Sequence, residues 1–249
     1  MVEGLFHVPG FLSGDEVTAL ISFARQVCTE APLRRPTMPD GTPLKLTLTN
    51  AGDFGWWSDR PLGYRYTVVH PTTKKEWPRI PMGVQLLAAR ALSHCGLPPM
   101  LIENCLVNSY APGESLGLHV DRTEEDKNAP IISFSVGADA EFLMGGREKS
   151  DRTESICLQS GDLVIQSGLS RHCFHGVRKI FQTMGNPLKN GGRLNFTLRK
   201  VTRDRHAPHV EPVSNTAVVY NDQAMDLCLG CGNLTADNVC PACIQKTHG

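Results

Sequence analysis

The sequence lacks the features that mark exported, membrane-bound or repetitive proteins. Met1–Phe6 at the N-terminus contains no basic region followed by a long apolar run, and no later apolar stretch is long enough to cross a bilayer. We find no internal repeat and no low-complexity tract. We therefore expect an intracellular protein without a membrane partner, cytoplasmic or, in a eukaryote, nuclear. We also expect a monomer.

The chain has no excess of either charge, because 25 basic residues balance 25 acidic residues. The net charge therefore neither demands nor excludes a nucleic-acid partner. Basic residues are nevertheless concentrated in one stretch, in which Asp204 is the only acid: Arg171, Arg178, Lys179, Lys189, Arg193, Arg199, Lys200, Arg203 and Arg205. Two interpretations stay open, cations that meet phosphate at the mouth of a site, or a solvated basic face with two buried arginines.

The nine cysteines do not form the pattern of a disulfide framework. Five occur singly, as small buried apolar residues do: Cys28, Cys95, Cys105, Cys157 and Cys173. The other four form two Cys-x-x-Cys pairs, Cys228 with Cys231 and Cys240 with Cys243. Two such pairs around a short polar loop are typical of a structural Zn(II) site, with a redox pair or chance as the alternatives. This usage also indicates a reducing compartment.

At 249 residues the chain can bury a substantial core, and one large β domain with a small appendage fits as well as two domains. Ser13 and Glu16 fit a capping box before an apolar helical face, and residues 82–95 have the pattern of a second amphipathic helix. From residue 101 onward, short strands alternate with turn signals, which favours a barrel or jelly roll. The predicted strands span residues 44–48, 64–69, 104–110, 116–120, 131–136, 140–144, 155–158, 162–166, 172–177 and 193–200.

Two histidines and one carboxylate stand out in this β region. His119 and Asp121 lie two residues apart in an extended segment, so their side chains point the same way, and His175 can reach them from a distant strand. Two histidines and a carboxylate are the ligands of non-haem Fe(II) oxygenases, which leave the other face of the metal open. A lone His-x-Asp is common by chance, so the interpretation depends on the residues around it.

Polar residues on two other predicted strands support the metal interpretation. Arg193 and Arg199 lie six residues apart on the last strand, so both point inward together, while apolar residues line the opposite face. Two fixed guanidinium groups can clamp a carboxylate cosubstrate. Asn108 and Tyr110 supply an amide and a phenol on one face of the strand before the first histidine.

Five motifs follow one another in this order: Asn-Ser-Tyr-Ala-Pro-Gly (108–113), Leu-His-Val-Asp (118–121), Ala-Pro-Ile-Ile-Ser-Phe-Ser-Val-Gly (129–137), Phe-His-Gly-Val (174–177) and Arg-Leu-Asn-Phe-Thr-Leu-Arg (193–199). With them the chain from about Phe54 to Arg199 resembles the AlkB family of Fe(II)/2-oxoglutarate-dependent dioxygenases. The resemblance implies an α+β, mainly β fold, in which a double-stranded β-helix (jelly-roll) core carries N-terminal helices and a nucleotide-recognition lid.

The expected domain organisation follows from the resemblance and from the cysteine pairs. Residues 1–206 would form the dioxygenase domain, with the lid at about 40–80 and the jelly-roll core at about 101–202. Residues 207–224 would be a linker, and residues 225–249 a small C-terminal zinc ribbon. The ribbon is not part of the usual minimal domain of the family. Three roles for it stay open: contact with nucleic acid, contact with a protein partner, or capping of the chain.

The resemblance implies roles for individual residues. Fe(II) would be held by His119, Asp121 and His175. The 2-oxoglutarate site would consist of Asn108, Tyr110, Arg193, Asn195 and Arg199, with Tyr110 and Arg193 on the distal carboxylate. The substrate base would meet Trp56, Tyr64, Tyr66, Thr123 and Lys149. A base removed from its stack needs a flat apolar wall and a polar rim, whereas the alternative makes Trp56 and Trp57 simply the core of the lid.

The implied reaction is oxidative demethylation of 1-methyladenine or 3-methylcytosine in DNA or RNA, with a single strand as the expected partner. With O2 as second cosubstrate, 2-oxoglutarate would become succinate and CO2, and the methyl group would leave as formaldehyde. A methyl group on the Watson–Crick edge blocks pairing, so such a base costs less to extrude. Thr123 stands where DNA-repairing members often carry an acid, and Arg147 competes with Lys149 for a place near the base, which leaves the base preference open.

Two other functions remain as alternatives. The same chemistry could act on a protein or a small molecule, against which the aromatic residues Trp56, Tyr64 and Tyr66 argue. A non-catalytic binding protein with a zinc ribbon is the second alternative. A dead oxygenase fold is expected to have lost a metal ligand or a clamp arginine, and this sequence retains all of them.

Overall fold

Two facing antiparallel sheets form the body of the molecule. The computed structural model describes residues 2–203 and two short strands, Asp226–Leu227 (β13) and Leu234–Thr235 (β14), which pair with each other. The larger sheet has the strand order β1 (Leu5–Val8), β10 (Leu163–Gln166), β7 (Ile131–Gly137), β12 (Arg193–Arg199), β5 (Asn104–Tyr110) and β2 (Thr47–Gly52). The smaller sheet has the order β6 (Leu116–His119), β11 (His175–Ile180), β8 (Ala140–Met144) and β9 (Glu154–Leu158).

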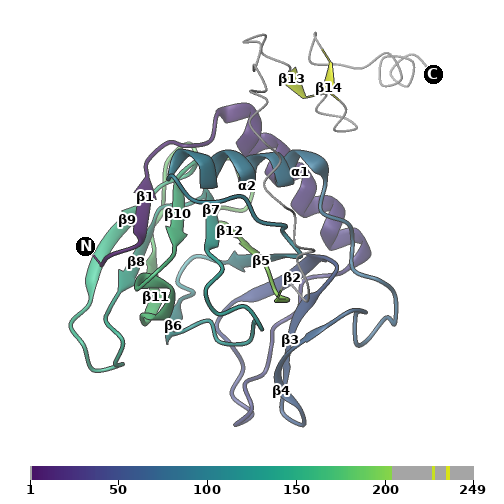
Figure 1. The fold of residues 1–249 in the computed structure, drawn as a ribbon. Helices are drawn as coiled ribbons and strands as arrows, with labels where there is room; N and C mark the ends of the chain where they lie inside the picture. The colour runs from purple at the N-terminus through teal and green to yellow at the C-terminus, as the bar shows by residue number, and fades with distance from the viewer. Residues whose placement is uncertain (1, 204–225, 228–233, 236–249) are drawn as a thin grey trace, which may run out of the picture. The chain divides into compact units, whose positions relative to one another are not determined.

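Apolar layers cover both faces of the larger sheet. Helices α1 (Gly14–Glu30) and α2 (Met82–His94) lie across its outer face (Figure 1), where Phe196 and Leu198 of β12 are fully buried with them. A second layer between the sheets contains Leu106 of β5 and Phe142 of β8. Because side chains alternate along a strand, the polar residues of β12 face the space between the two sheets.

The predicted start of the first helix is confirmed. Ser13 accepts a hydrogen bond from the backbone N–H of Glu16 (3.2 Å), and the Glu16 carboxylate accepts one from the N–H of Ser13 (2.8 Å), which is a complete capping box. Arg90 of α2 donates to Glu16 at 2.7 Å and so ties the two helices together. Within the described residues, no helix is both long and apolar enough to cross a membrane.

Strands β3 (Gly55–Asp59) and β4 (Gly63–Thr67) form a separate hairpin, drawn at the lower edge of Figure 1. Trp56 lies opposite Tyr66 in its register. Trp57 points to the other face, where it packs with buried Trp77. The guanidinium carbon of Arg34 lies over the Trp57 ring, 3.4 Å from its centroid. The hairpin therefore has one core-like face and one face with Trp56 and Tyr64, whose rings stack at 5.7 Å.

The predicted strands are largely confirmed, and the differences arise from long-range contacts. The strand predicted at 172–177 was wrong at its start, because Ser170–His172 form a short 3-10 helix and β11 begins at His175. The strand predicted at 44–48 lies at 47–52. Strands β1 and β3 were not predicted, since β1 is defined by its pairing with β10 and β3 begins with glycine and ends with aspartate, residues that are rare in strands.

The described residues confirm a mainly β fold with few helices and antiparallel sheets. The predicted linker at 207–224 and the predicted zinc ribbon at 225–249 lie outside the described residues, apart from the strands β13 and β14. Of the ribbon's four cysteines, Cys228, Cys231, Cys240 and Cys243, none is among the described residues.

Candidate metal centre and its pocket

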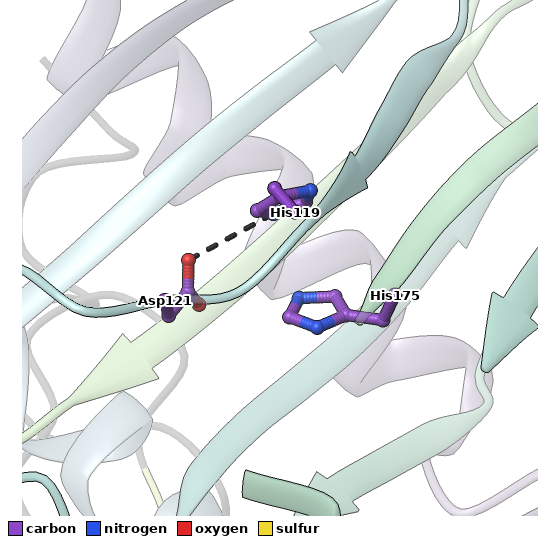
Figure 2. Close-up of side chains that lie close together, drawn as sticks. All are labelled: His119, Asp121 and His175. Atoms are coloured by element: carbon purple, nitrogen blue, oxygen red, sulfur yellow. Dashed lines mark ion pairs between the residues drawn. The ribbon is translucent and has the colours of Figure 1, made fainter. Parts of the chain in front are cut away.

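His119, Asp121 and His175 come together at the junction of two neighbouring strands. His119 ends β6, Asp121 follows two residues later, and His175 begins β11, opposite His119 in the register of the two strands. Their ligand atoms all lie within 4.8 Å of one another (Figure 2). The predicted trio therefore has the spacing of a metal site. In the part of the chain that the structure describes, it is the one group of three such side chains that does.

The backbone sets the orientation of both imidazole rings. His119 Nδ1 lies 2.9 Å from the carbonyl oxygen of Gly117, and His175 Nδ1 lies 3.2 Å from that of Cys173. A carbonyl oxygen only accepts a hydrogen bond, so each contact is a hydrogen bond in the form of the ring that carries a proton on Nδ1, which leaves Nε2 as the nitrogen available to a metal. The ring centroids are 4.4 Å apart, and the amide of Gln166 packs against His175 Nδ1 at 3.2 Å.

The charges at the centre suit a cation. Burial is the main cause that lowers the pKa of His175, to about 3, and the neighbouring His119 lowers it further. The ring is therefore neutral and able to bind a metal at neutral pH. Burial opposes the charge of Asp121, but Arg199 and both histidines hold the pKa of that carboxyl well below its usual range. Asp121 Oδ1 lies 3.8 Å from His119 Nε2. The donor set of two imidazole nitrogens and one carboxylate oxygen fits Fe(II) with open positions.

A cavity of about 590 Å³ opens over this centre, between the sheets. Its wall contains the three candidate metal ligands and all five residues predicted for 2-oxoglutarate: Asn108, Tyr110, Arg193, Asn195 and Arg199. Four of the five residues predicted for the base also line it, namely Trp56, Tyr64, Thr123 and Lys149. Tyr66 is the exception, since its hydroxyl turns to Glu124 and donates to it at 2.6 Å. Burial raises the pKa of Tyr66 well above its usual value, so the hydroxyl stays a donor.

Arg193 has the surroundings expected of an anion clamp. Its side chain is 1% exposed and donates to Ser135 Oγ (2.7 Å) and the carbonyl oxygen of Ala138 (3.4 Å), while its Nε has no hydrogen-bond partner. Burial lowers the pKa of Arg193 to about 10, which still leaves it charged at neutral pH. A buried cation bonded to neutral oxygens is poorly compensated, so a carboxylate in the cavity would stabilise it. The fully buried Tyr110 hydroxyl lies on the neighbouring strand, opposite Arg193 in register.

The rest of the polar face of β12 leads from Arg193 to the metal centre. Asn195 and Asn108 both direct an amide nitrogen to Thr197 Oγ1, at 2.9 and 3.4 Å. Arg199 donates to Asp121 Oδ2 at 2.8 Å, while its Nη1 is buried without a hydrogen-bond partner. Unpartnered donors at both ends of one strand fit a dicarboxylate such as 2-oxoglutarate, one end against Arg193 and the other beside the metal.

A second hollow of about 510 Å³ adjoins the first and is lined by Arg122, Arg147, Glu148 and His172, with Arg122 in both walls. Arg147 therefore lies in this second hollow, while Lys149 lines the cavity itself. The described cations of the predicted basic stretch differ in burial and in pairing. Arg171, Arg193 and Arg199 are buried, and exposed Arg178 pairs with Glu141.

Sequence reasoning missed several residues around the centre. Ser135 and Gln166 were not among the predicted site residues, and Arg171 was predicted only as one cation of the basic stretch. All three are buried and contact Arg193, His175 and the Asp121 backbone, respectively. Glu124, which follows Thr123, was not among the predicted site residues either. Gln166 and Arg171 precede His175 by nine and four residues, which was the available signal, but their contacts depend on how β10 and the short helix before β11 fold back.

The fold and the site agree with the comparisons to known proteins. The family model described as 2OG-Fe(II) oxygenase superfamily matches residues 4–199, so the chain belongs to that superfamily. Its metal is Fe(II) and its cosubstrate 2-oxoglutarate, as the superfamily name states.

Within the superfamily the chain belongs to the AlkB family. The alpha-ketoglutarate-dependent dioxygenase AlkB of Escherichia coli is 36% identical over 181 residues, which are 73% of this chain and 83% of that protein. The solved structure of OsALKBH1 is 28% identical, with a TM-score of 0.70 over 80% of this chain and 99% of that chain. The tRNA demethylase abh1 of Schizosaccharomyces pombe is 39% identical over 114 residues, 41% of this chain and 38% of that protein.

Proposed function

We propose that this chain is an Fe(II)- and 2-oxoglutarate-dependent demethylase of nucleic acids, which acts on 1-methyladenine and 3-methylcytosine. One observation carries the proposal. The cavity that has His119, Asp121 and His175 in its wall also contains the stacked pair Trp56 and Tyr64. A metal centre beside an aromatic pair suits oxidation of a group on a flat, unstacked base.

The residues divide into three groups by position. His119, Asp121 and His175 would hold Fe(II), and Arg193 with Tyr110 would hold the distal carboxylate of 2-oxoglutarate. When bound, Fe(II) and 2-oxoglutarate supply the chemistry that uses O2 to hydroxylate the methyl group, with succinate, CO2 and formaldehyde as the products. The protein orients the cosubstrate through fixed cations and excludes bulk water from it.

The base would lie against Trp56 and Tyr64, whose rings stack at 24° to each other. Thr123 and Lys149 line the same cavity and would contact the polar edge of the base. The adjoining hollow, lined by Arg122, Arg147, Glu148 and His172, has two arginines against one carboxylate and so offers a net positive charge beside the cavity. A polynucleotide carries a phosphate at every step, so this charge supports a nucleic acid over a free base.

The name of the yeast relative, a tRNA demethylase, supports a nucleic-acid substrate but does not choose between DNA and RNA for this chain. Both polymers therefore belong in the test.

The decisive experiment is mass spectrometry of a short single strand with one 1-methyladenine or 3-methylcytosine, in DNA and RNA versions. The oligonucleotide would be incubated in air with the full chain, Fe(II), 2-oxoglutarate and ascorbate. We expect loss of one methyl mass and release of formaldehyde with the wild type. His175→Ala and Asp121→Ala should be inactive because each removes a metal ligand.

His94→Ala, at the exposed end of α2, is the matched control and should keep the activity. If the wild type binds Fe(II) and 2-oxoglutarate but no tested strand changes mass, the proposed substrate is wrong. The same chemistry on a protein or small molecule would then be the next candidate. If the wild type and His175→Ala bind Fe(II) equally, the metal centre itself is wrong.

We also propose that Cys228, Cys231, Cys240 and Cys243 hold a structural Zn(II). Support comes from their spacing alone, two Cys-x-x-Cys pairs at the end of the chain. A segment of this length has too little apolar surface to fold without a metal.

A further inference from the structure

Four charges of alternating sign lie in a row beside the metal centre, the half-buried Asp121 followed by the buried Arg199, Glu124 and Arg171. Asp121 Oδ2 accepts from Arg199 Nη2 at 2.8 Å, and Arg199 Nε lies 3.3 Å from Glu124 Oε1. Glu124 Oε2 in turn accepts from Arg171 Nη2 at 2.9 Å. The side chains of Glu124 and Arg171 are 2% and 1% exposed, so solvent does not compensate their charges.

Such a row of charges is not expected to add much to the stability of the fold. Removing three charges from water is expensive, and apolar residues of similar size are often as stabilising in the same place. The contacts of this row are instead directed at functional elements. One end of the row is the candidate ligand Asp121, and Arg171 at the other end donates to the backbone carbonyl oxygen of Asp121. Glu124, between the two arginines, accepts a hydrogen bond from Tyr66 of the β3–β4 hairpin.

Asp121 is fixed at two points. Arg199 occupies its Oδ2, while Arg171 Nη1 holds its backbone carbonyl oxygen at 2.7 Å. Arg171 Nε also donates to the carbonyl oxygen of Ala129, two residues before β7, at 3.1 Å. The carboxylate therefore has one committed oxygen, and Oδ1 is the one that faces His119.

Glu124 joins these two arginines and also reaches the hairpin. Its Oε1 accepts a hydrogen bond from the hydroxyl of Tyr66 on β4 at 2.6 Å and forms an ion pair with Arg199 Nε at 3.3 Å. Both carboxylate oxygens are thus engaged inside the protein. Since Trp56 lies opposite Tyr66 in the hairpin, the wall that would receive the base is tied to the same carboxylate as the metal ligand.

We propose that Glu124, together with Arg171, is a positioning residue that fixes Asp121 as a one-oxygen metal ligand and holds the β3–β4 hairpin in register with the metal centre through Tyr66. The inference rests on the proposed metal centre. It gives Glu124 no direct contact with the base or the metal. Glu124 follows Asp121 by three residues, so a single loop carries both the candidate metal ligand and the carboxylate that positions it.

The test uses the metal-free full chain and Co(II), whose visible absorption reports the coordination of the metal. Glu124→Gln keeps the size of the side chain and removes its charge. It should weaken Co(II) binding by roughly 10- to 100-fold and change the absorption bands, as loss of a group behind a metal ligand does. Glu124→Asp keeps the charge and should recover part of the affinity. Glu141→Gln is the control, because its pair with Arg178 is on the exposed side of the smaller sheet.

Tyr66→Phe tests the hairpin contact separately. It removes one hydroxyl and keeps the ring, so the KM for a methylated oligonucleotide should rise about 3- to 10-fold. The Co(II) spectrum should stay that of the wild type, because both arginine contacts of Glu124 remain.

Glu124→Gln with wild-type Co(II) affinity and spectrum, and only a lower melting temperature, would show a structural role and overturn the proposal. If Glu124→Gln does not fold, unchanged Co(II) affinity in Glu124→Asp and an unchanged KM in Tyr66→Phe together overturn it. A wild type that binds Co(II) no better than His175→Ala would instead refute the metal centre, and this inference with it.

Discussion

Arg193 and Arg199 lie on the same face of β12 but have opposite surroundings. Arg193 donates to neutral oxygens and keeps an unpartnered Nε, whereas Arg199 is paired with Asp121 and lies close to Glu124. A cation without a carboxylate partner is the one that gains most from an incoming anion. Arg193 should therefore contribute most to cosubstrate affinity.

Arg193→Met should weaken 2-oxoglutarate binding by at least roughly 30-fold, about 2 kcal/mol, because the distal carboxylate loses its charged partner. Metal affinity should change little, since the three ligands remain in place. Isothermal titration of the metal-loaded chain with 2-oxoglutarate measures the effect. Arg178→Met, which breaks an exposed pair with Glu141, is the control. Equal affinity in Arg193→Met and the wild type would show that the clamp lies elsewhere.

The buried ring of His175 gives the metal-free protein a defined pH dependence. Its pKa is about 3 in the fold and 6.5 in its usual state, so the unfolded chain binds a proton below pH 6.5 that the folded chain does not. Stability is therefore fully present above pH 6.5 and falls as the pH drops from 6.5 towards 3. The slope from this group is at most about 1.4 kcal/mol per pH unit.

Urea unfolding at pH 7.5 and pH 5 measures this loss. The metal-free wild type should lose about 1 kcal/mol or more beyond what metal-free His175→Gln loses over the same interval. Identical losses in the two proteins would assign the pH dependence to other groups.

At the scale of elements, the β3–β4 hairpin places two adjacent tryptophans on opposite faces. Trp57 is 7% exposed, donates from Nε1 to Asp59 at 2.9 Å and packs with Trp77, which is a core position. Trp56 lines the cavity and stacks on Tyr64. Trp57 is therefore a core residue, whereas Trp56 has the position that the proposed wall for a base requires.

Substituting each tryptophan by alanine should produce different defects. Trp57→Ala should lower the free energy of unfolding by about 3–5 kcal/mol, as removal of a large buried ring does. Trp56→Ala should raise the KM for a methylated single strand by about 5- to 150-fold, the equivalent of one lost base stack of about 1–3 kcal/mol. Chemical unfolding and steady-state kinetics on both variants separate the two effects. A Trp56→Ala enzyme with wild-type KM and reduced stability would make Trp56 core as well.

At the scale of the whole molecule, a net charge of zero conceals local differences. The described arginines of the basic stretch are largely buried or paired. The cations beside the cavity, Arg122 and Arg147, come from other parts of the sequence. A sum of charges therefore predicts nothing about the surface near the site. The proposed zinc site at the C-terminal cysteines also concerns the whole chain, and a measurement on the full chain tests it.

The full chain should contain about one Zn(II) that depends on the C-terminal cysteines. Elemental analysis of Cys228→Ser/Cys231→Ser should show this zinc lost, since two thiolates cannot complete a four-coordinate site. Cys157→Ser, at an exposed single cysteine of β9, should keep it. Zinc that persists in the double variant, or its absence from the wild type, would contradict the proposed ribbon.

Much of the site could be read from the sequence, because backbone geometry fixes which neighbours along a strand share a face. That period of two placed His119 with Asp121 and Arg193 with Arg199, and the structure confirms both pairs on common faces. Capping chemistry likewise located the first helix from Ser13. These are local properties, set by covalent spacing and by hydrogen bonds between near neighbours.

Only the tertiary structure decided what distant segments do to one another. The pairing of β6 with β11 brings His175 to His119, and the same folding buries Glu124 between two arginines that are far apart in sequence. It also turned the Tyr66 hydroxyl away from the cavity. Burial and charge pairing depend on which surfaces meet, and no periodicity along the chain contains that information.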